Sequence, residues 1–373
     1  METKPIGLYV HIPFCLRKCN YCDFCSVCFD KERIELYVES LISEIKSYGA
    51  SPKIKIDSIF FGGGTPSTLP ESLFKKIASS IYENFEVCEN TEFSIEVNPA
   101  TVTAEKLNAF VCAGVNRISI GLQSIHENEM KILGRIHTYD DFKKTFYMVR
   151  AAGIKNINVD LMYGIPEQTE KSLSQTLNAI ISLNPEHVSA YGLIIEEGTP
   201  FFEMKDELKL PDEDTEYAMY LSIDRILSER GYRHYEISNY AKDGYVCRHN
   251  LKYWRDQEYI GLGIAAHSYY EGKRFYNSSS FDEYFDNFGI NYRREENDNK
   301  GIDKFEYAML ALRLSEGISL TEYKNLFGED FAGDKQDLLN CYISSGYMKI
   351  FGDRISFTAK GFYVSNAIMA ELL

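Results

Sequence analysis

The sequence lacks long hydrophobic runs, because no apolar stretch in its 373 residues approaches the ~18 residues that a membrane-spanning helix needs. A secretion signal is also missing, since the chain begins with METKP rather than with basic residues followed by an apolar segment. We therefore expect a cytoplasmic protein with reduced thiols. Any association with a membrane would come through a partner protein.

Basic residues are too few to balance the acidic ones: 40 Lys and Arg stand against 55 Asp and Glu, and the net charge is −15. Such a surface repels phosphate polymers, so we expect no nucleic acid partner. The chain is rich instead in hydrophobic side chains, at 45%, and in aromatic ones, at 14%. This composition is typical of a globular protein, and the length allows two or three domains.

Cysteines are gathered in one place, since five of the nine fall between residues 15 and 28. Disulfides are disfavoured in a reducing compartment, and structural zinc is disfavoured because no second cysteine or histidine pair follows at zinc-finger spacing. The spacing Cys15-x3-Cys19-x2-Cys22 favours an iron–sulfur cluster, with three thiolates leaving one iron of a four-iron cluster open to a substrate. Cys19, Cys22, Cys25 and Cys28 form an alternative, ferredoxin-like series, which the sequence leaves open.

Short β-branched runs alternate with helical patterns up to about residue 230, which indicates parallel strands joined by crossover helices. The predicted strands are 8–12, 58–61, 92–97, 117–121, 156–162 and 187–193. The predicted helices are 32–48, 71–84, 103–112, 139–151, 170–182 and 213–229. Polar or glycine-bearing segments follow most strands, at the edge where parallel sheets build their sites: 13–28, 62–67, 98–99, 123–124 and 164–168.

The alternation weakens beyond residue 231, and the sequence there predicts strands or loops that cap the sheet. A charged stretch, 293–301, is typical of a linker. Helical patterns at 303–314, 319–327 and 335–345, followed by a strand pair and a last helix, predict a small winged-helix-like domain. We therefore expect three units, 1–230, 231–292 and 302–373, with the last serving for packing rather than for DNA binding.

A glycine run, Gly62-Gly63-Gly64, ends the second predicted strand and is followed by Thr65 and Pro66. Three glycines let the backbone approach a ligand where a Cβ atom would clash. A phosphate-binding loop is disfavoured because no Lys-Ser or Lys-Thr pair follows at the required spacing. A turn that only reverses the chain is the remaining alternative.

Polar side chains occur within or just beyond apolar strands, at Glu96, Gln123, Arg135 and Asp160. Such groups are costly to bury unless they are paired, so they are either ligand contacts or members of a buried ion pair. The spacing alone does not decide between these alternatives.

The cysteine spacing and the glycine run together resemble the radical S-adenosylmethionine (SAM) enzymes, in which the open iron binds SAM and an electron from the cluster cleaves its sulfonium bond. The resemblance implies an α/β fold, namely an incomplete (β/α)6 barrel with a small C-terminal winged-helix-like α+β domain. It also implies a 4Fe-4S cluster on Cys15, Cys19 and Cys22. The implied SAM contacts are Tyr9, Tyr21, Phe24, Gly63, Gly64, Thr65, Glu96, Gln123, Arg135 and Asp160.

Within that superfamily the chain resembles the oxygen-independent coproporphyrinogen oxidase-like branch, which contains coproporphyrinogen III dehydrogenases (HemN) and haem chaperones (HemW). Three features favour the chaperones. Only 14 residues precede Cys15, Phe24 stands where the dehydrogenases have a fourth cysteine, and residues 249–254 read His-Asn-Leu-Lys-Tyr-Trp, which matches the chaperones' haem motif.

The resemblance implies haem binding through His249, Tyr253 and Trp254, because an imidazole is a natural axial ligand and aromatic rings pack on the macrocycle. A core histidine bonded to its neighbours is the alternative. The implied partners are haem, recipient haemoproteins that include membrane-bound ones, an electron donor of flavodoxin or ferredoxin type, and a second copy of the chain. Oxidative decarboxylation of coproporphyrinogen III is the alternative function, and SAM cleavage in turnover is left open.

Overall fold

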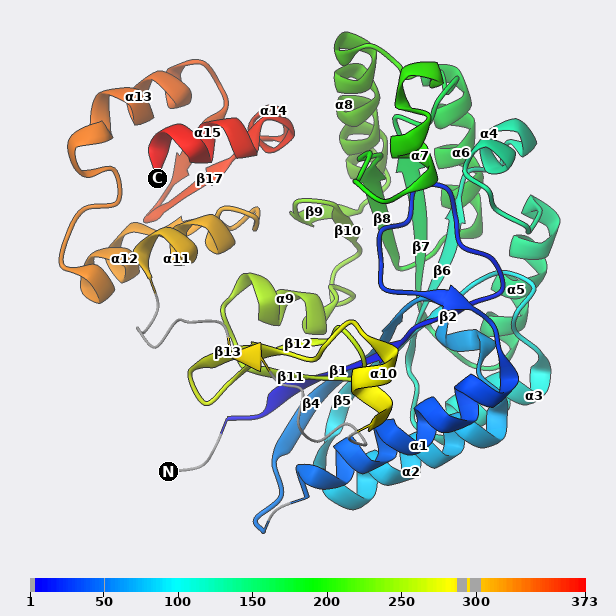
Figure 1. The fold of residues 1–373 in the computed structure, drawn as a ribbon. Coiled ribbons are helices and arrows are strands. Elements are labelled where there is room, and N and C mark those ends of the chain that lie inside the picture. Colours follow the sequence, from blue (N-terminus) through cyan, green and yellow to red (C-terminus); the bar gives the residue numbers. More distant parts are fainter. Residues whose placement is uncertain (1–3, 50, 287–293, 296–302) are drawn as a thin grey trace.

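The computed structural model describes residues 4–49, 51–286, 294–295 and 303–373. Its centre is a curved sheet of parallel strands (Figure 1). In spatial order these are β1 (Ile6–Ile12), β4 (Lys55–Gly63), β5 (Glu86–Val97), β6 (Arg117–Gln123), β7 (Asn156–Tyr163) and β8 (His187–Gly192). The six predicted strands and the barrel-type α/β fold class are confirmed.

Crossover helices cover the outer face of this sheet (Figure 1). They are α1 (Lys31–Ser47), α2 (Glu71–Asn84), α3 (Ala104–Cys112), α5 (Tyr139–Ala151), α6 (Glu170–Leu183) and α8 (Glu213–Glu229). Strand β6 shows how the two faces differ: Ile118 and Ile120 are buried in the apolar core, whereas Arg117 and Ser119 line a cavity on the inner face. The period of two in the strand therefore separates packing positions from polar ones.

Short strands extend the sheet at both edges, where the sequence predicted strands or loops. At one edge β11 (Tyr259–Leu262) pairs parallel to β1 and is followed by β12 (His267–Tyr270), β13 (Lys273–Tyr276) and β14 (Arg294–Glu295). At the other edge β10 (Asn239–Ala241) pairs with β8, and β9 (Arg233–Glu236) is outermost. Apart from β14, the predicted linker 293–301 lies outside the described residues.

Several short helices, which the sequence did not predict, lie in the loops of the barrel. They are η1 (Pro66–Thr68), α4 (Glu127–Ile132), α7 (Pro200–Glu203), η2 (Lys205–Glu207), α9 (Arg248–Trp254) and α10 (Phe281–Asp286). Helix α9 matters most for the site, because it carries the predicted haem motif. It contacts β4, so that the motif lies against the inner side of the sheet.

The C-terminal domain combines helices with a three-stranded sheet of order β15-β17-β16, in agreement with the predicted helical domain. Its elements are α11 (Lys304–Ala311), β15 (Ile318–Ser319), α12 (Leu320–Phe327), η3 (Gly333–Lys335), α13 (Gln336–Ser344), β16 (Met348–Phe351), β17 (Arg354–Phe357), α14 (Ala359–Tyr363) and α15 (Ser365–Leu372). It packs on the barrel through Tyr363, whose ring lies 5.1 Å from that of Tyr217 and 5.6 Å from that of Tyr220 on α8.

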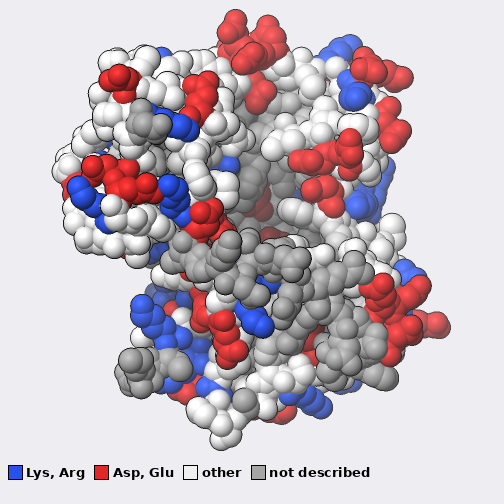
Figure 2. All heavy atoms as spheres, turned by 60° about the vertical axis from the view of Figure 1, so that its left-hand side comes forward, with Lys and Arg blue, Asp and Glu red and all other residues white. Residues whose placement is uncertain are grey.

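In the described part of the chain no helix is long and apolar enough to cross a membrane. Acidic side chains are spread over the face shown in Figure 2, and basic side chains stand in small groups between them. Helix α13, at the position of a recognition helix in a winged-helix fold, contains neither Lys nor Arg. A phosphate backbone would find few cationic partners on that helix.

Candidate functional site

A cleft of about 510 Å³ opens at the carboxyl ends of the parallel strands and reaches into the barrel. It brings together fifteen of the sixteen predicted site residues. These are Tyr9, Cys15, Cys19, Tyr21, Cys22, Phe24, Gly63, Gly64, Thr65, Glu96, Gln123, Arg135, Asp160, His249 and Tyr253. Trp254 does not line the cleft but packs against a separate apolar cluster that includes Tyr235 and Leu314.

The cysteine loop is held on both sides of the cleft. It begins at β2 (Phe14–Cys15) and returns through β3 (Val27–Cys28), which pairs parallel to β2. At its tip the Asn20 side chain donates a hydrogen bond to the Ile132 carbonyl at 2.8 Å, and the Asn20 backbone N–H donates to the Leu133 carbonyl at 3.0 Å. These bonds tie the loop to the far side of the barrel, across the cavity from its own strands.

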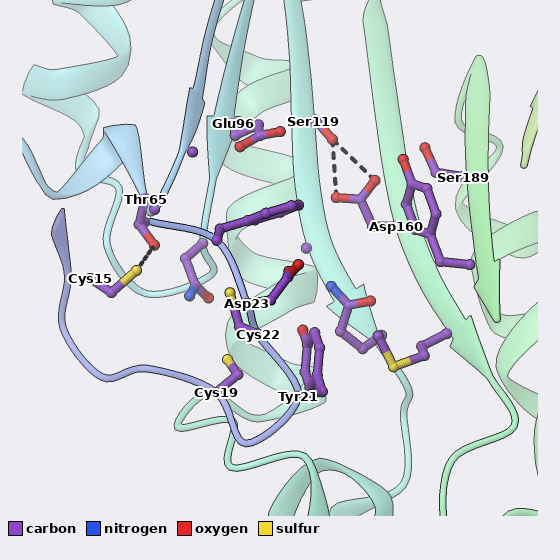
Figure 3. Close-up of a pocket in the computed structure, with 18 of the residues that line it drawn as sticks. Cys15, Cys19, Tyr21, Cys22, Asp23, Thr65, Glu96, Ser119, Asp160 and Ser189 are labelled. Carbon is purple, nitrogen blue, oxygen red and sulfur yellow. Dashed lines mark hydrogen bonds between the residues drawn. The ribbon is translucent and has the colours of Figure 1, made fainter. Parts of the chain in front are cut away.

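The side chains of Cys15, Cys19 and Cys22 project from the loop into the cleft (Figure 3). The Thr65 hydroxyl donates to the Cys15 sulfur at 3.5 Å, and the Arg135 guanidinium donates to the Cys19 sulfur at 3.6 Å. Donors aimed at sulfur stabilise thiolates. Among the described residues no three Cys, His, Asp or Glu side chains converge as ligands of a single ion would. Separated thiols suit a cluster, whose ligands bind different irons.

Cys25 and Cys28 lie outside the cleft. Cys25 packs against the apolar core, and its carbonyl is bonded to His11 Nε2 at 2.8 Å. Cys28 is exposed. The ferredoxin-like series would therefore require the loop to rearrange, whereas Cys15, Cys19 and Cys22 already face one cavity.

Burial raises the pKa of the Cys15 thiol, and it raises the pKa of the Cys22 thiol to about 11. Both groups are therefore neutral at physiological pH while the cleft is free of metal. Binding of iron displaces these protons, because the thiolate is the metal ligand.

Close packing explains the glycine run at the end of β4. Gly63 has φ of 106°, and a Cβ atom there would lie 2.5 Å from the ring of His11. A Cβ atom at Gly64 would lie 2.9 Å from the backbone nitrogen of Phe14. The strand that leads into the cysteine loop therefore crosses the glycine run at backbone contact.

Gly64→Ala is expected to displace this crossing. The added Cβ atom meets three backbone atoms of Ile12 and Phe14 at 2.9 to 3.0 Å, which cannot move as a flexible side chain can. We expect a loss of about 1–3 kcal/mol in the free energy of unfolding. We also expect poorer cluster incorporation, measured as iron per chain. Gly153→Ala on the surface is a control for lost stability alone, because Gly153 has φ of 92° but no atom lies within 4 Å of its Cβ position, so it should lower stability without affecting cluster incorporation.

Two half-buried carboxylates, Glu96 on β5 and Asp160 on β7, lie in the cleft (Figure 3). Burial, and then repulsion from Asp160, raises the pKa of Glu96 to about 8. Burial also raises the pKa of Asp160, although Ser119 and Asn158 donate hydrogen bonds to its carboxylate. A cation in the cleft would be favoured by the ionised forms of both groups.

Gln123 and Arg135 present unsatisfied polar atoms. Gln123 has φ of 71°, which is strained for a residue with a side chain, and its Oε1 is buried without a hydrogen-bond partner in the described part of the chain. Arg135 donates from Nη2 to the Gly121 carbonyl at 2.7 Å, yet its Nε lacks a partner among those residues. Buried atoms of this kind are normally satisfied by a ligand or by water.

Further polar residues, which the sequence reasoning missed, also line the cleft. They are Asn98, Arg117, Ser119, Asn158 and Ser189. The alternation of side chains along a strand could have indicated Arg117 and Ser119, because they lie on the same face of β6 as Gln123. That signal was obscured because continuous apolar runs dominate these strands.

His249 lies in the wall of the cleft and is 1% exposed. A hydrogen bond of 3.0 Å joins its Nδ1 to Ser58 Oγ, and one of 2.8 Å joins its Nε2 to the hydroxyl of Tyr253. Burial, followed by the cations of Lys252 and Arg117, lowers its pKa to about 3. The imidazole is therefore neutral, as a metal ligand must be, but it has to release one hydrogen bond before it can bind iron.

Comparisons with known proteins give a consistent relationship. Residues 9–180 match the model of the radical SAM superfamily, and residues 304–364 match that of the HemN C-terminal domain. Heme chaperone HemW from Lactococcus lactis is 33% identical over 100% of this chain and 98% of its own. Heme chaperone HemW from Escherichia coli is 34% identical over 100% of this chain and 99% of its own. The structure of coproporphyrinogen III oxidase (HemN) from Escherichia coli has a TM-score of 0.82, covering 98% of this chain and 89% of that one, at 21% identity.

Proposed function

The chain belongs to the heme chaperone HemW family of radical SAM proteins, and on that premise we propose that it binds haem and delivers it to recipient haemoproteins. The observation that supports this proposal most is the position of His249. This neutral imidazole lines the same cleft as the three loop cysteines. A tetrapyrrole ligand and a redox centre would therefore share one cavity.

Within this proposal Cys15, Cys19 and Cys22 hold a 4Fe-4S cluster, and Arg135 and Thr65 donate hydrogen bonds to its ligands. When bound, the cluster supplies electrons at low potential to SAM. The residues that orient SAM by charge-assisted hydrogen bonds are Glu96, Gln123, Arg135 and Asp160. Tyr9, Tyr21, Phe24, Gly63 and Gly64 complete its surroundings.

The affinity for SAM is expected to rise with pH between pH 6 and pH 8. The pKa of Glu96 is raised to about 8, so this group is mostly protonated in the ligand-free cleft below that pH. SAM is a cation and favours the ionised form, so binding releases a proton. The dissociation constant should fall up to about tenfold per pH unit and level off near pH 8.

Calorimetric titration in buffers of different ionisation enthalpy measures both the affinity and the released proton. Glu96→Gln should flatten the pH dependence, and Glu83→Gln on the exposed face of α2 should leave it unchanged. A steep dependence that persists in Glu96→Gln would assign the proton to another group.

Proposed partners follow from the same premise. Haem is the cargo, haemoproteins including membrane-bound ones are the recipients, and a flavodoxin or ferredoxin is the electron donor. We also propose that the chain forms a homodimer in the cytoplasm.

The alternative, coproporphyrinogen III dehydrogenase activity, can be tested directly. The reconstituted protein is incubated without oxygen with SAM, a reductant and coproporphyrinogen III, and deoxyadenosine and the porphyrinogen product are followed together. We expect no protoporphyrinogen beyond a stoichiometric trace. Catalytic formation of protoporphyrinogen would replace the chaperone proposal by the enzymatic one.

A further inference from the structure

Arg117 is a buried cation that forms no ion pair with the residues that the structure describes. It lies on β6, is 2% exposed and lines the floor of the cleft. In the described part of the chain its Nε has no hydrogen-bond partner, and no carboxylate lies within 4.0 Å of its guanidinium in an ion pair. A guanidinium without partners is expensive to bury, so a position of this kind is commonly completed by an anion or by water.

Polar atoms on the two neighbouring strands also lack hydrogen-bond partners among the described residues. Arg117 stands in register with Ser94 on β5 and with Asn156 on β7. The Ser94 hydroxyl and Asn156 Oδ1 are buried without partners among the described residues. Three adjacent strands therefore present unsatisfied polar atoms at one level of the barrel, where a packed barrel would place apolar side chains.

The wall of the cleft beside this floor is aromatic. The rings of Tyr9 and Phe60 lie 6.3 Å apart at 28°, and those of Phe60 and His249 lie 5.4 Å apart at 27°. The three rings are thus inclined to one another by at most 30°, and all three residues line the cleft. Ser119, Asn158 and Asp160 form a hydrogen-bonded polar group in the same cavity.

The charges near Arg117 limit the ligand to a weak anion. Arg117 interacts over longer range with Glu92 and Asp160, and Glu96 is close to Asp160. The two negative charges of a phosphate dianion would exceed the single positive charge of Arg117, whereas one carboxylate would match it. A planar carboxylate also fits the fork of a guanidinium in a two-point contact.

We propose that Arg117 binds a carboxylate of a ligand whose flat conjugated ring lies across the edges of the Tyr9, Phe60 and His249 rings. This inference rests on the proposed function, from which the ligand is haem and the carboxylate one of its propionates. Arg117 then recognises the propionate edge of the macrocycle, and His249 is left to bind the iron. The protein would therefore recognise haem by its propionates as well as by its iron.

The test compares haem with its dimethyl ester, in which both propionates are neutral, by absorption titration of the wild-type protein in one detergent-containing buffer. We expect the ester to bind about tenfold to a hundredfold more weakly, because a charge-assisted contact is lost in a buried site. Arg117→Met should lower the affinity for haem to that for the ester and remove the difference between them. Arg117→Lys should retain part of the preference.

Equal affinity of the wild-type protein for haem and for the ester would overturn this inference and leave haem binding intact. Full preference for haem in Arg117→Met would also overturn it. Absence of haem binding to the wild-type protein would instead remove the proposed function, and this inference with it. The wild-type comparison is decisive even where a variant folds poorly, and circular dichroism identifies such a variant.

Discussion

Replacing Cys19 by serine is expected to abolish the iron–sulfur cluster, and replacing Cys28 by serine is expected to leave it intact. Cys19 lines the cleft beside Arg135, whose guanidinium donates to its sulfur, whereas Cys28 is exposed on β3 and lies outside the cleft. Loss of one of three protein ligands leaves a second iron without a thiolate. We expect iron and acid-labile sulfide to fall at least tenfold in Cys19→Ser.

The measurement is iron and sulfide per chain after anaerobic reconstitution, together with the electron paramagnetic resonance of the reduced protein. Cys28→Ser and Cys25→Ser are matched controls, because they alter the same loop without altering the cleft. Loss of the cluster in both controls, with retention in Cys15→Ser, would instead support the ferredoxin-like series.

His249→Ala and Tyr253→Phe are expected to change haem affinity in opposite directions. His249→Ala removes the proposed iron ligand and should weaken binding by about a hundredfold, since even changes beside metal ligands cost about 10–100-fold. Tyr253→Phe removes the hydroxyl that bonds His249 Nε2 at 2.8 Å. The imidazole then no longer gives up that bond on binding iron, so affinity should rise about fivefold.

Haem absorption titration measures both effects, and the position of the Soret band reports the loss of the imidazole ligand. His187→Gln is a matched control, because His187 is buried with both ring nitrogens bonded, to Asn158 and Tyr235, but does not line the cleft. If His249 were only a core residue, both substitutions would lower stability and neither would alter the affinity of the folded protein.

The barrel could be predicted from sequence because its strands are continuous apolar runs separated by amphipathic helices. The capping boxes at Thr138 and Thr169 fix the starts of α5 and α6 at the predicted positions. The cysteine spacing and the glycine run led to the radical SAM resemblance, and fifteen of the sixteen residues that the resemblance implied line the cleft, the exception being Trp254. Local patterns sufficed to predict the site because the carboxyl ends of parallel strands lie at one edge of the sheet.

The remaining features depend on contacts between distant segments. No local pattern indicates that β11 pairs parallel to β1, or that helix α9 turns His249 inward while Trp254 packs elsewhere. Residues 249–254 form one continuous motif in the sequence, but neighbouring residues of a helix point in different directions. Arg117 was missed because its lack of an ion pair among the described residues is visible only once the strands on either side are placed.

The central claim is that this chain carries haem to other proteins, and haem transfer tests it most directly. In one arrangement the haem-loaded protein and an apo-haemoprotein are separated by a dialysis membrane that protein-bound haem cannot cross. In the other arrangement the two proteins are mixed in one solution. We predict that the recipient acquires its own haem spectrum faster in contact than across the membrane, and that the donor loses one haem for each haem gained. Equal rates in both arrangements would mean that haem is merely released into solution, which would contradict the chaperone function.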